Sequence, residues 1–201
     1  DWDTSDWGLE SRLEGPYEDL DAFLNRPDEL ALDLLGQGIT GMKIWPFDHA
    51  AKDSDGYYIS NESLDRCLEP FQKIRNAVGD KMDIMVELHS LWRLPAALKI
   101  AEALEPYNPY WYEDPVRMDS LPALARFAEA TRVPVCASET IAGRWGYRDL
   151  IESGAPGILM PDIVWCGGLT EAKKISPLGE TYHLPVAPHD CTGPVAFMAA
   201  V

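Results

Sequence analysis

The chain contains 201 residues, of which 46% are hydrophobic and 25% are charged, as is typical of a globular domain with one sizeable core. Its formal net charge of −16 argues against nucleic acid or an anionic membrane as a partner, although it is compatible with a cation site. No apolar run approaches the roughly 18 residues of a membrane span, and the acidic opening segment shows no signal-peptide pattern. The four widely spaced cysteines, without a C-x-x-C pair, fit a reduced, cytoplasmic protein better than a disulfide framework.

Apolar segments alternate with amphipathic ones along the chain, which predicts strands and helices in turn. The first expected elements are a helix over 26–38, a strand over 41–47 that Pro46 ends, and a helix over 61–80 that Ser60 or Asn61 caps. Further strands are expected over 83–89, 110–115, 133–139, 157–164 and 184–190. Further helices are expected over 94–106, 120–131, 144–154, 168–182 and from 193 onward.

Strands that are apolar throughout and separated by helices predict an α/β fold with a parallel sheet. An open doubly wound sheet and a (β/α)8 barrel of the TIM type both satisfy this pattern, but no G-x-G-x-x-G motif follows the first strand. A barrel brings every strand end to one mouth, and polar residues end nearly every strand: Lys43, Glu87, Glu113, Glu139, Asp162 and His189. Since a complete barrel needs about 250 residues, we expect residues 1–201 to form its central part, about strands two to seven.

Three glutamates end successive strands at equal intervals of 26 residues: Glu87, Glu113 and Glu139. Carboxylates that converge on one mouth repel one another and raise each other's pKa. A hard divalent cation removes this conflict, and Mg²⁺ takes oxygen ligands while leaving positions for substrate oxygens. Each glutamate could instead pair with an arginine or cap a helix, but three in register favour a metal site.

Asp162 and His189 end the next two strands. An imidazole that donates one ring N–H to a carboxylate is oriented and becomes more basic, so this pair is a candidate catalytic dyad. The alternative is that His189 is a core or helix-capping histidine.

His89 and Lys43 are two further candidates for catalysis. His89 lies two residues after Glu87, and alternation along a strand would place both side chains on one face, where His89 could protonate a leaving hydroxyl. Lys43 could hold a substrate carboxylate or stabilise an enolate. The alternatives are a hydrogen-bonded strand-end histidine and a salt bridge between Lys43 and one of the glutamates.

Five short motifs together resemble the mandelate racemase subgroup of the enolase superfamily, in particular its acid-sugar dehydratases. They are E-x-H at 87–89, YEDP at 112–115, SET at 138–140, MPDIVWCGG at 160–168 and APHD at 187–190. YEDP alone is weakly specific, whereas five motifs at matched spacing over nearly the whole chain are strongly so.

This resemblance implies a hydro-lyase that binds Mg²⁺ through three carboxylates, those of Glu87, Glu113 and Glu139. In such enzymes the base, here His189 with Asp162, removes the proton α to the carboxylate of a small acid-sugar substrate. A histidine placed like His89 assists departure of the β-hydroxyl. The resemblance also implies a homo-oligomer and a capping domain before the barrel, which we expect to lie outside this chain.

The sequence departs from the pattern of the subgroup at two site positions. Racemases carry K-x-K on the second strand, whereas this chain has Lys43-Ile44-Trp45, so the usual second base is missing and dehydration is favoured. The first metal ligand is Glu87, where aspartate is more usual. The strand-eight glutamate that would bond the substrate carboxylate is also expected outside the chain. A racemase or epimerase of a 2-hydroxy acid with the same metal site, and a non-catalytic homologue, are the alternative functions.

Overall fold

The computed structural model describes residues 19–52 and 54–201, so the acidic opening segment lies outside the described residues. Its five-stranded sheet contains β1 (Gly41–Ile44), β2 (Asp83–Glu87), β3 (Trp111–Glu113), β4 (Val135–Ala137) and β5 (Ile158–Leu159). All neighbouring strands are parallel, and their order in the sheet is their order in the chain. A doubly wound sheet reverses its strand order at a switch point, and this sheet does not. The arrangement is therefore part of a TIM-type barrel, as predicted.

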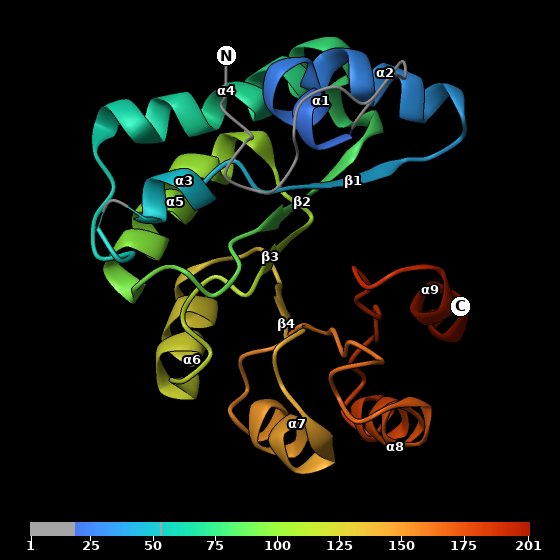
Figure 1. Cartoon of the computed structure of the whole chain (residues 1–201). Coiled ribbons are helices and arrows are strands. Elements are labelled where there is room, and N and C mark those ends of the chain that lie inside the picture. Colours follow the sequence, from blue (N-terminus) through green and yellow to red (C-terminus); the bar gives the residue numbers. More distant parts are fainter. Residues whose placement is uncertain (1–18, 53) are drawn as a thin grey trace.

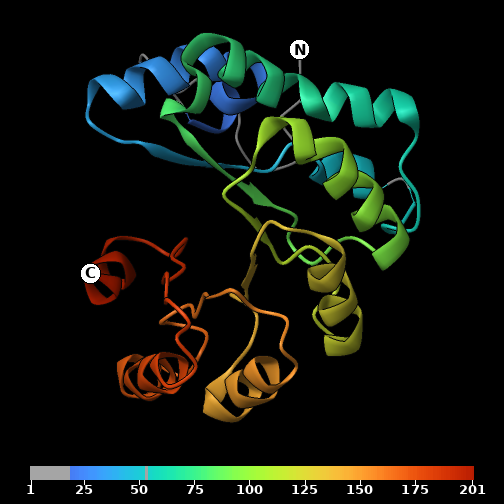
Figure 2. The same ribbon diagram turned by 180° about the vertical axis from the view of Figure 1, so that it is seen from behind.

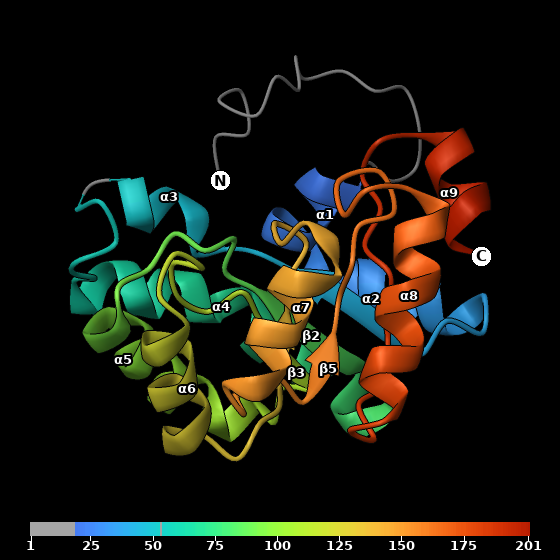
Figure 3. The same ribbon diagram turned by 90° about the horizontal axis from the view of Figure 1, so that it is seen from below.

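The helices lie on the outer side of the strands. In Figure 1, α4 to α8 follow one another around the sheet in chain order, and Figures 2 and 3 show the same arrangement from behind and from below. Their bounds are α1 (Asp19–Asn25), α2 (Pro27–Gly36), α3 (Asp48–Lys52), α4 (Asn61–Val78), α5 (Leu94–Leu104), α6 (Leu121–Ala130), α7 (Gly143–Glu152), α8 (Leu169–Glu180) and α9 (Pro194–Ala200). Short 3₁₀ turns, Gly79–Lys81 and Glu105–Tyr107, follow α4 and α5. Helices α1 and α3 are additions to the predicted set.

Local sequence explains both the limits and the orientation of α4, the longest of the helices in the described residues. Ser60 is its N-cap, because its side chain accepts a 3.0 Å hydrogen bond from the backbone N–H of Ser63. Gly79, with φ of 59°, ends it in a conformation that a residue with a side chain rarely adopts. Apolar side chains recur at helical spacing on the buried face: Leu64, Cys67, Phe71, Ile74 and Val78.

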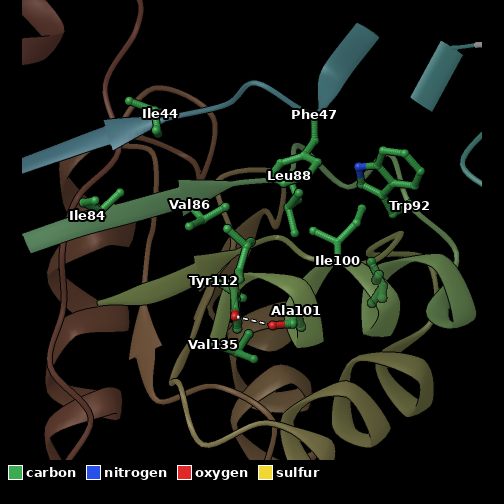
Figure 4. Close-up of a cluster of buried hydrophobic side chains, with 14 of the residues drawn as sticks. Ile44, Phe47, Ile84, Val86, Leu88, Trp92, Ile100, Ala101, Tyr112 and Val135 are labelled. Carbon is green, nitrogen blue, oxygen red and sulfur yellow. Dashed lines mark hydrogen bonds between the residues drawn. The ribbon is translucent and has the colours of Figure 1, made fainter. Parts of the chain in front are cut away.

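Alternation along the strands separates the side chains that pack against the helices from those that face the inner side of the sheet. Val86 of β2 and Tyr112 of β3 belong to the core and pack near Ile100 of α5, and the Tyr112 hydroxyl donates a 3.1 Å hydrogen bond to the Ala101 carbonyl (Figure 4). The residues of opposite parity point to the inner side of the curved sheet. They include Glu87, so the packing of the helices fixes which way the site residues face.

All the predicted strands are shorter than expected, and the last two differ most from the expectation. Only Ile158–Leu159 forms a strand within 157–164, and 184–190 contributes two isolated parallel bridges, Leu159 to Val186 and Asp162 to His189. The expectation of a regular sixth strand is therefore wrong. The physical reason is that three residues of the two segments lack a backbone N–H donor: Pro161, Pro185 and Pro188.

The segment over 184–190 still runs beside β5, because the remaining donors are used. The backbone N–H of Ala187 donates to the Leu159 carbonyl at 2.9 Å, and that of His189 donates to the Pro161 carbonyl at 3.1 Å. Among the described residues, no helix combines the length and the apolar character required to cross a membrane.

Candidate active site

The three predicted metal ligands come together at the carboxyl ends of β2, β3 and β4. Glu87 and Glu113 are directly opposite each other in the parallel register of β2 and β3, and Glu139 lies two residues beyond β4. One carboxylate oxygen from each residue lies within 4.8 Å of the others. Glu87 and Glu113 are fully buried. Oxygen donors at this spacing are suited to a hard divalent cation such as Mg²⁺.

Lys43 lies between two of these carboxylates. Its Nζ is 2.6 Å from Oε1 of Glu113 and 3.3 Å from Oε2 of Glu87. Lys43 therefore forms salt bridges with two of the glutamates, which is the alternative that the sequence left open for it. Burial lowers the pKa of Lys43, but the charges of Glu113 and Glu87 outweigh burial and raise it. The ammonium group therefore remains charged and neutralises part of the site.

One lysine does not neutralise the three carboxylates. Burial and the neighbouring Glu87 together raise the pKa of Glu113 well above its usual range, although Lys43 opposes the shift. Trp111 donates a 3.0 Å hydrogen bond from Nε1 to Oε2 of Glu113 and so orients that carboxylate. A buried carboxyl whose pKa is raised by a neighbouring carboxylate gains stability from an added cation, so the residues present fit Mg²⁺.

The structure also brings the two members of the candidate dyad together. Oδ2 of Asp162 lies 2.8 Å from Nδ1 of His189, and Oδ1 accepts hydrogen bonds from the backbone N–H groups of Val164 and Trp165 at 2.7 and 2.9 Å. Asp162 is therefore fixed in place, with only 1% of its surface exposed.

The other ring nitrogen of His189, Nε2, faces the metal ligands. It lies 2.7 Å from Oε2 of Glu139. Burial lowers the pKa of His189, but its bonds to Glu139 and Asp162 outweigh burial and raise it. Because Asp162 occupies Nδ1, Nε2 is the atom that can exchange a proton with a substrate.

His89 reaches the site by a different route from the one that strand alternation predicts. Strand β2 ends at Glu87, and His89 follows in the left-handed region with φ of 47°, so the same-face argument does not apply to it. Its backbone N–H donates a 2.6 Å hydrogen bond to Oε1 of Glu87. The rings of Trp45 and His89 are packed edge to face, with their centroids 5.9 Å apart. The imidazole is nevertheless close enough to the carboxylate cluster for the charges of Glu87 and Glu139 to raise its pKa.

Asp48, at the start of α3, is a site residue that the sequence did not predict. Its Oδ2 lies 2.9 Å from Nδ1 of His89, so His89 is held by an aspartate as His189 is. Burial lowers the pKa of His89, but Asp48 and the charge of Glu87 outweigh burial and raise it to about 9. The five-residue helix α3 is too short to give a periodic signal, which explains why Asp48 was missed.

Comparisons with known proteins agree with this architecture. The sequence model of the family described as enolase C-terminal domain-like matches residues 28–201. D-galactonate dehydratase from Ralstonia pickettii (strain 12J) is 30% identical over 167 residues, which are 82% of this chain and 44% of that protein. D-xylonate dehydratase from Haloferax volcanii is 31% identical over 149 residues, which are 74% of this chain and 36% of that protein. The chain therefore spans less than half the length of these curated relatives.

Solved structures show the same likeness. The crystal structure of an enolase of the mandelate racemase subgroup from Agrobacterium tumefaciens has a TM-score of 0.85 at 60% identity, covering 87% of this chain and 48% of that one. An enolase protein from environmental sequencing of the Sargasso Sea also has a TM-score of 0.85, at 45% identity, covering 89% of this chain and 48% of that one. The chain belongs to the enolase C-terminal domain-like family, and its structural neighbours are enolases of the mandelate racemase subgroup.

Proposed function

We propose that the complete protein is a Mg²⁺-dependent dehydratase of a small acid sugar, which is a hydro-lyase. This chain supplies the central strands and helices of its barrel. The observation that carries the proposal is the cluster of three carboxylates within 4.8 Å of one another, with Nε2 of His189 2.7 Å from one of them. The names of the relatives support it, since they are D-galactonate and D-xylonate dehydratases.

The proton α to a carboxylate is too weakly acidic for a histidine to remove unaided. Glu87, Glu113 and Glu139 would hold Mg²⁺, which supplies positive charge for the substrate carboxylate and for the enediolate that forms from it. Nε2 of His189 takes the proton from Cα, while Asp162 holds the other ring nitrogen and stabilises the imidazolium.

Elimination then requires a proton for the leaving group. In this proposal the bond between Cβ and its hydroxyl breaks, and His89 donates a proton to that oxygen, which departs as water. The remaining enol becomes a 2-keto-3-deoxy acid by tautomerisation. Asp48 keeps Nδ1 of His89 occupied and leaves Nε2 as the donor.

The proposal is tested by incubating the complete protein with Mg²⁺ and a library of acid sugars in D₂O. The expected product is a 2-keto-3-deoxy acid. Deuterium at Cα with the β-hydroxyl retained would identify a racemase or epimerase instead, an activity that Trp45 in place of a second lysine disfavours. Absence of both Mg²⁺ binding and turnover would identify a non-catalytic homologue.

His89→Asn is expected to slow dehydration by about 10²-fold or more, because the leaving hydroxyl loses its general acid. Exchange of the α-proton is expected to continue, because His189 and the carboxylates are unchanged. The measurement is the ratio of deuterium incorporation at Cα to product formation with a substrate identified in the library. His183→Asn, at an exposed histidine that also has a positive φ, is the matched control and is expected to leave the ratio unchanged. Equal loss of exchange and dehydration in His89→Asn would contradict the role of His89.

A further inference from the structure

Two buried polar residues, Asp114 and Ser138, are next in sequence to two of the candidate metal ligands but are not candidate ligands themselves. Asp114 directly follows Glu113 at the end of β3, and Ser138 directly precedes Glu139 beyond β4. Their exposed fractions are 1% and 0%. Burial of polar groups is costly unless they bond well, so this pair requires an explanation.

A short hydrogen bond links the pair. Oγ of Ser138 donates to Oδ2 of Asp114 at 2.6 Å, and the backbone N–H of Asp114 donates to the Cys136 carbonyl at 3.1 Å. The side-chain bond thus connects the residue after one ligand to the residue before the next. Any change in the separation of these two strand ends would have to stretch or break it.

The surroundings of the pair restrain it further. The hydroxyl of Tyr147, a buried residue of α7, donates a 2.5 Å hydrogen bond to the Ser138 carbonyl, and Oγ1 of Thr140 lies 2.9 Å from Oγ of Ser138. Asp114 has φ of 38°, a conformation that costs free energy in a residue other than glycine. Its Oδ1 is buried and has no hydrogen-bond partner among the residues that the structure describes. The hydrogen bond between Ser138 and Asp114 is therefore present despite a strained backbone and an unpaired carboxylate oxygen at Asp114.

We infer that Asp114 and Ser138 are positioning residues that fix the separation of Glu113 and Glu139 and thereby set the affinity of the cation site. The inference rests on the proposed function, because it concerns the same three carboxylates. Neither residue contacts the cation or the substrate; each acts through the adjacent ligand. Groups that orient metal ligands typically contribute about 10–100-fold to affinity, because they remove alternative arrangements of the ligands.

The test is calorimetric titration of the complete protein with Mg²⁺, which needs no substrate. Ser138→Ala and Asp114→Ala are each expected to raise Kd by about 10–100-fold. The double variant is expected to show little more than either single variant, since all three lack the same hydrogen bond. Asp114→Asn keeps an acceptor oxygen and is expected to rescue most of the affinity. If Ser138→Ala does not fold, Ser138→Cys, which retains the volume with a weaker donor, gives the same comparison.

Tyr112→Phe is the matched control. It removes a buried hydrogen bond from the residue before Glu113, but that bond is directed to Ala101 of α5 and away from the ligands. The control is expected to lower the melting temperature and to leave the Kd for Mg²⁺ unchanged. An unchanged Kd in Ser138→Ala, or an equal rise in Tyr112→Phe, would overturn the inference alone. A wild-type protein that binds no Mg²⁺ would overturn the proposed function as well.

Discussion

Glu113→Gln is expected to abolish Mg²⁺-dependent turnover of the complete protein, with a loss of about 10³-fold or more. Glu113 is fully buried, lies opposite Glu87 in the sheet register and forms the 2.6 Å contact with Lys43. The amide removes one of three anionic ligands and leaves the ammonium group of Lys43 with fewer negative partners, so an added cation is repelled more strongly.

The measurement combines Mg²⁺ titration with turnover on a substrate found in the acid-sugar library. Glu129→Gln is the control, because it makes the same chemical change at an exposed residue of α6. It is expected to retain wild-type Kd and rate. Full Mg²⁺-dependent turnover in Glu113→Gln would show that the carboxylate cluster is not the metal site.

His189→Asn is expected to stop exchange of the α-proton, lowering its rate by about 10²–10⁴-fold. Asparagine fits the same space but cannot act as a base near neutral pH. Because the three carboxylates remain, the variant is expected to bind Mg²⁺, which separates loss of the base from loss of the metal site.

The measurement is deuterium incorporation at Cα followed by NMR, with Mg²⁺ affinity determined on the same sample. His183→Asn again serves as the control, and its exchange rate is expected to match that of the wild type. Exchange that persists in His189→Asn would show that another group removes the proton.

The alternation of strands and helices could be predicted because each element has its own local signal. Strand β2 is apolar between Asp83 and Glu87, and α4 has a serine N-cap, a glycine at its C-terminus and apolar side chains at helical spacing. The extent of the sheet near its last members could not be predicted in this way. Pro185 and Pro188 do not prevent the chain from running extended beside β5; they remove the donors that would make it a regular strand.

The three glutamates could be predicted because parallel strands end on the same side of a barrel, so residues at equal intervals along the chain come close together in space. The contacts of Lys43 could not be chosen from the sequence, since both a salt bridge and a substrate contact fit a strand-end lysine. Asp48, Asp114 and Ser138 were missed because their partners lie far along the chain and depend on the path of loops. Asp114 in particular has a left-handed backbone that no local pattern indicates.

The two halves of the candidate site differ in how firmly they are attached. Glu87 and Glu113 belong to strands with continuous pairing, whereas His189 lies on a segment joined to its neighbour by isolated bridges. Fewer shared backbone bonds mean a lower free energy of local opening, so this segment is expected to open more readily than β2 and β3. Under the proposed function, the segment that carries His189 is thus the more readily deformed part of the site, and it can adjust to acid sugars of different shape while the carboxylate cluster keeps its geometry.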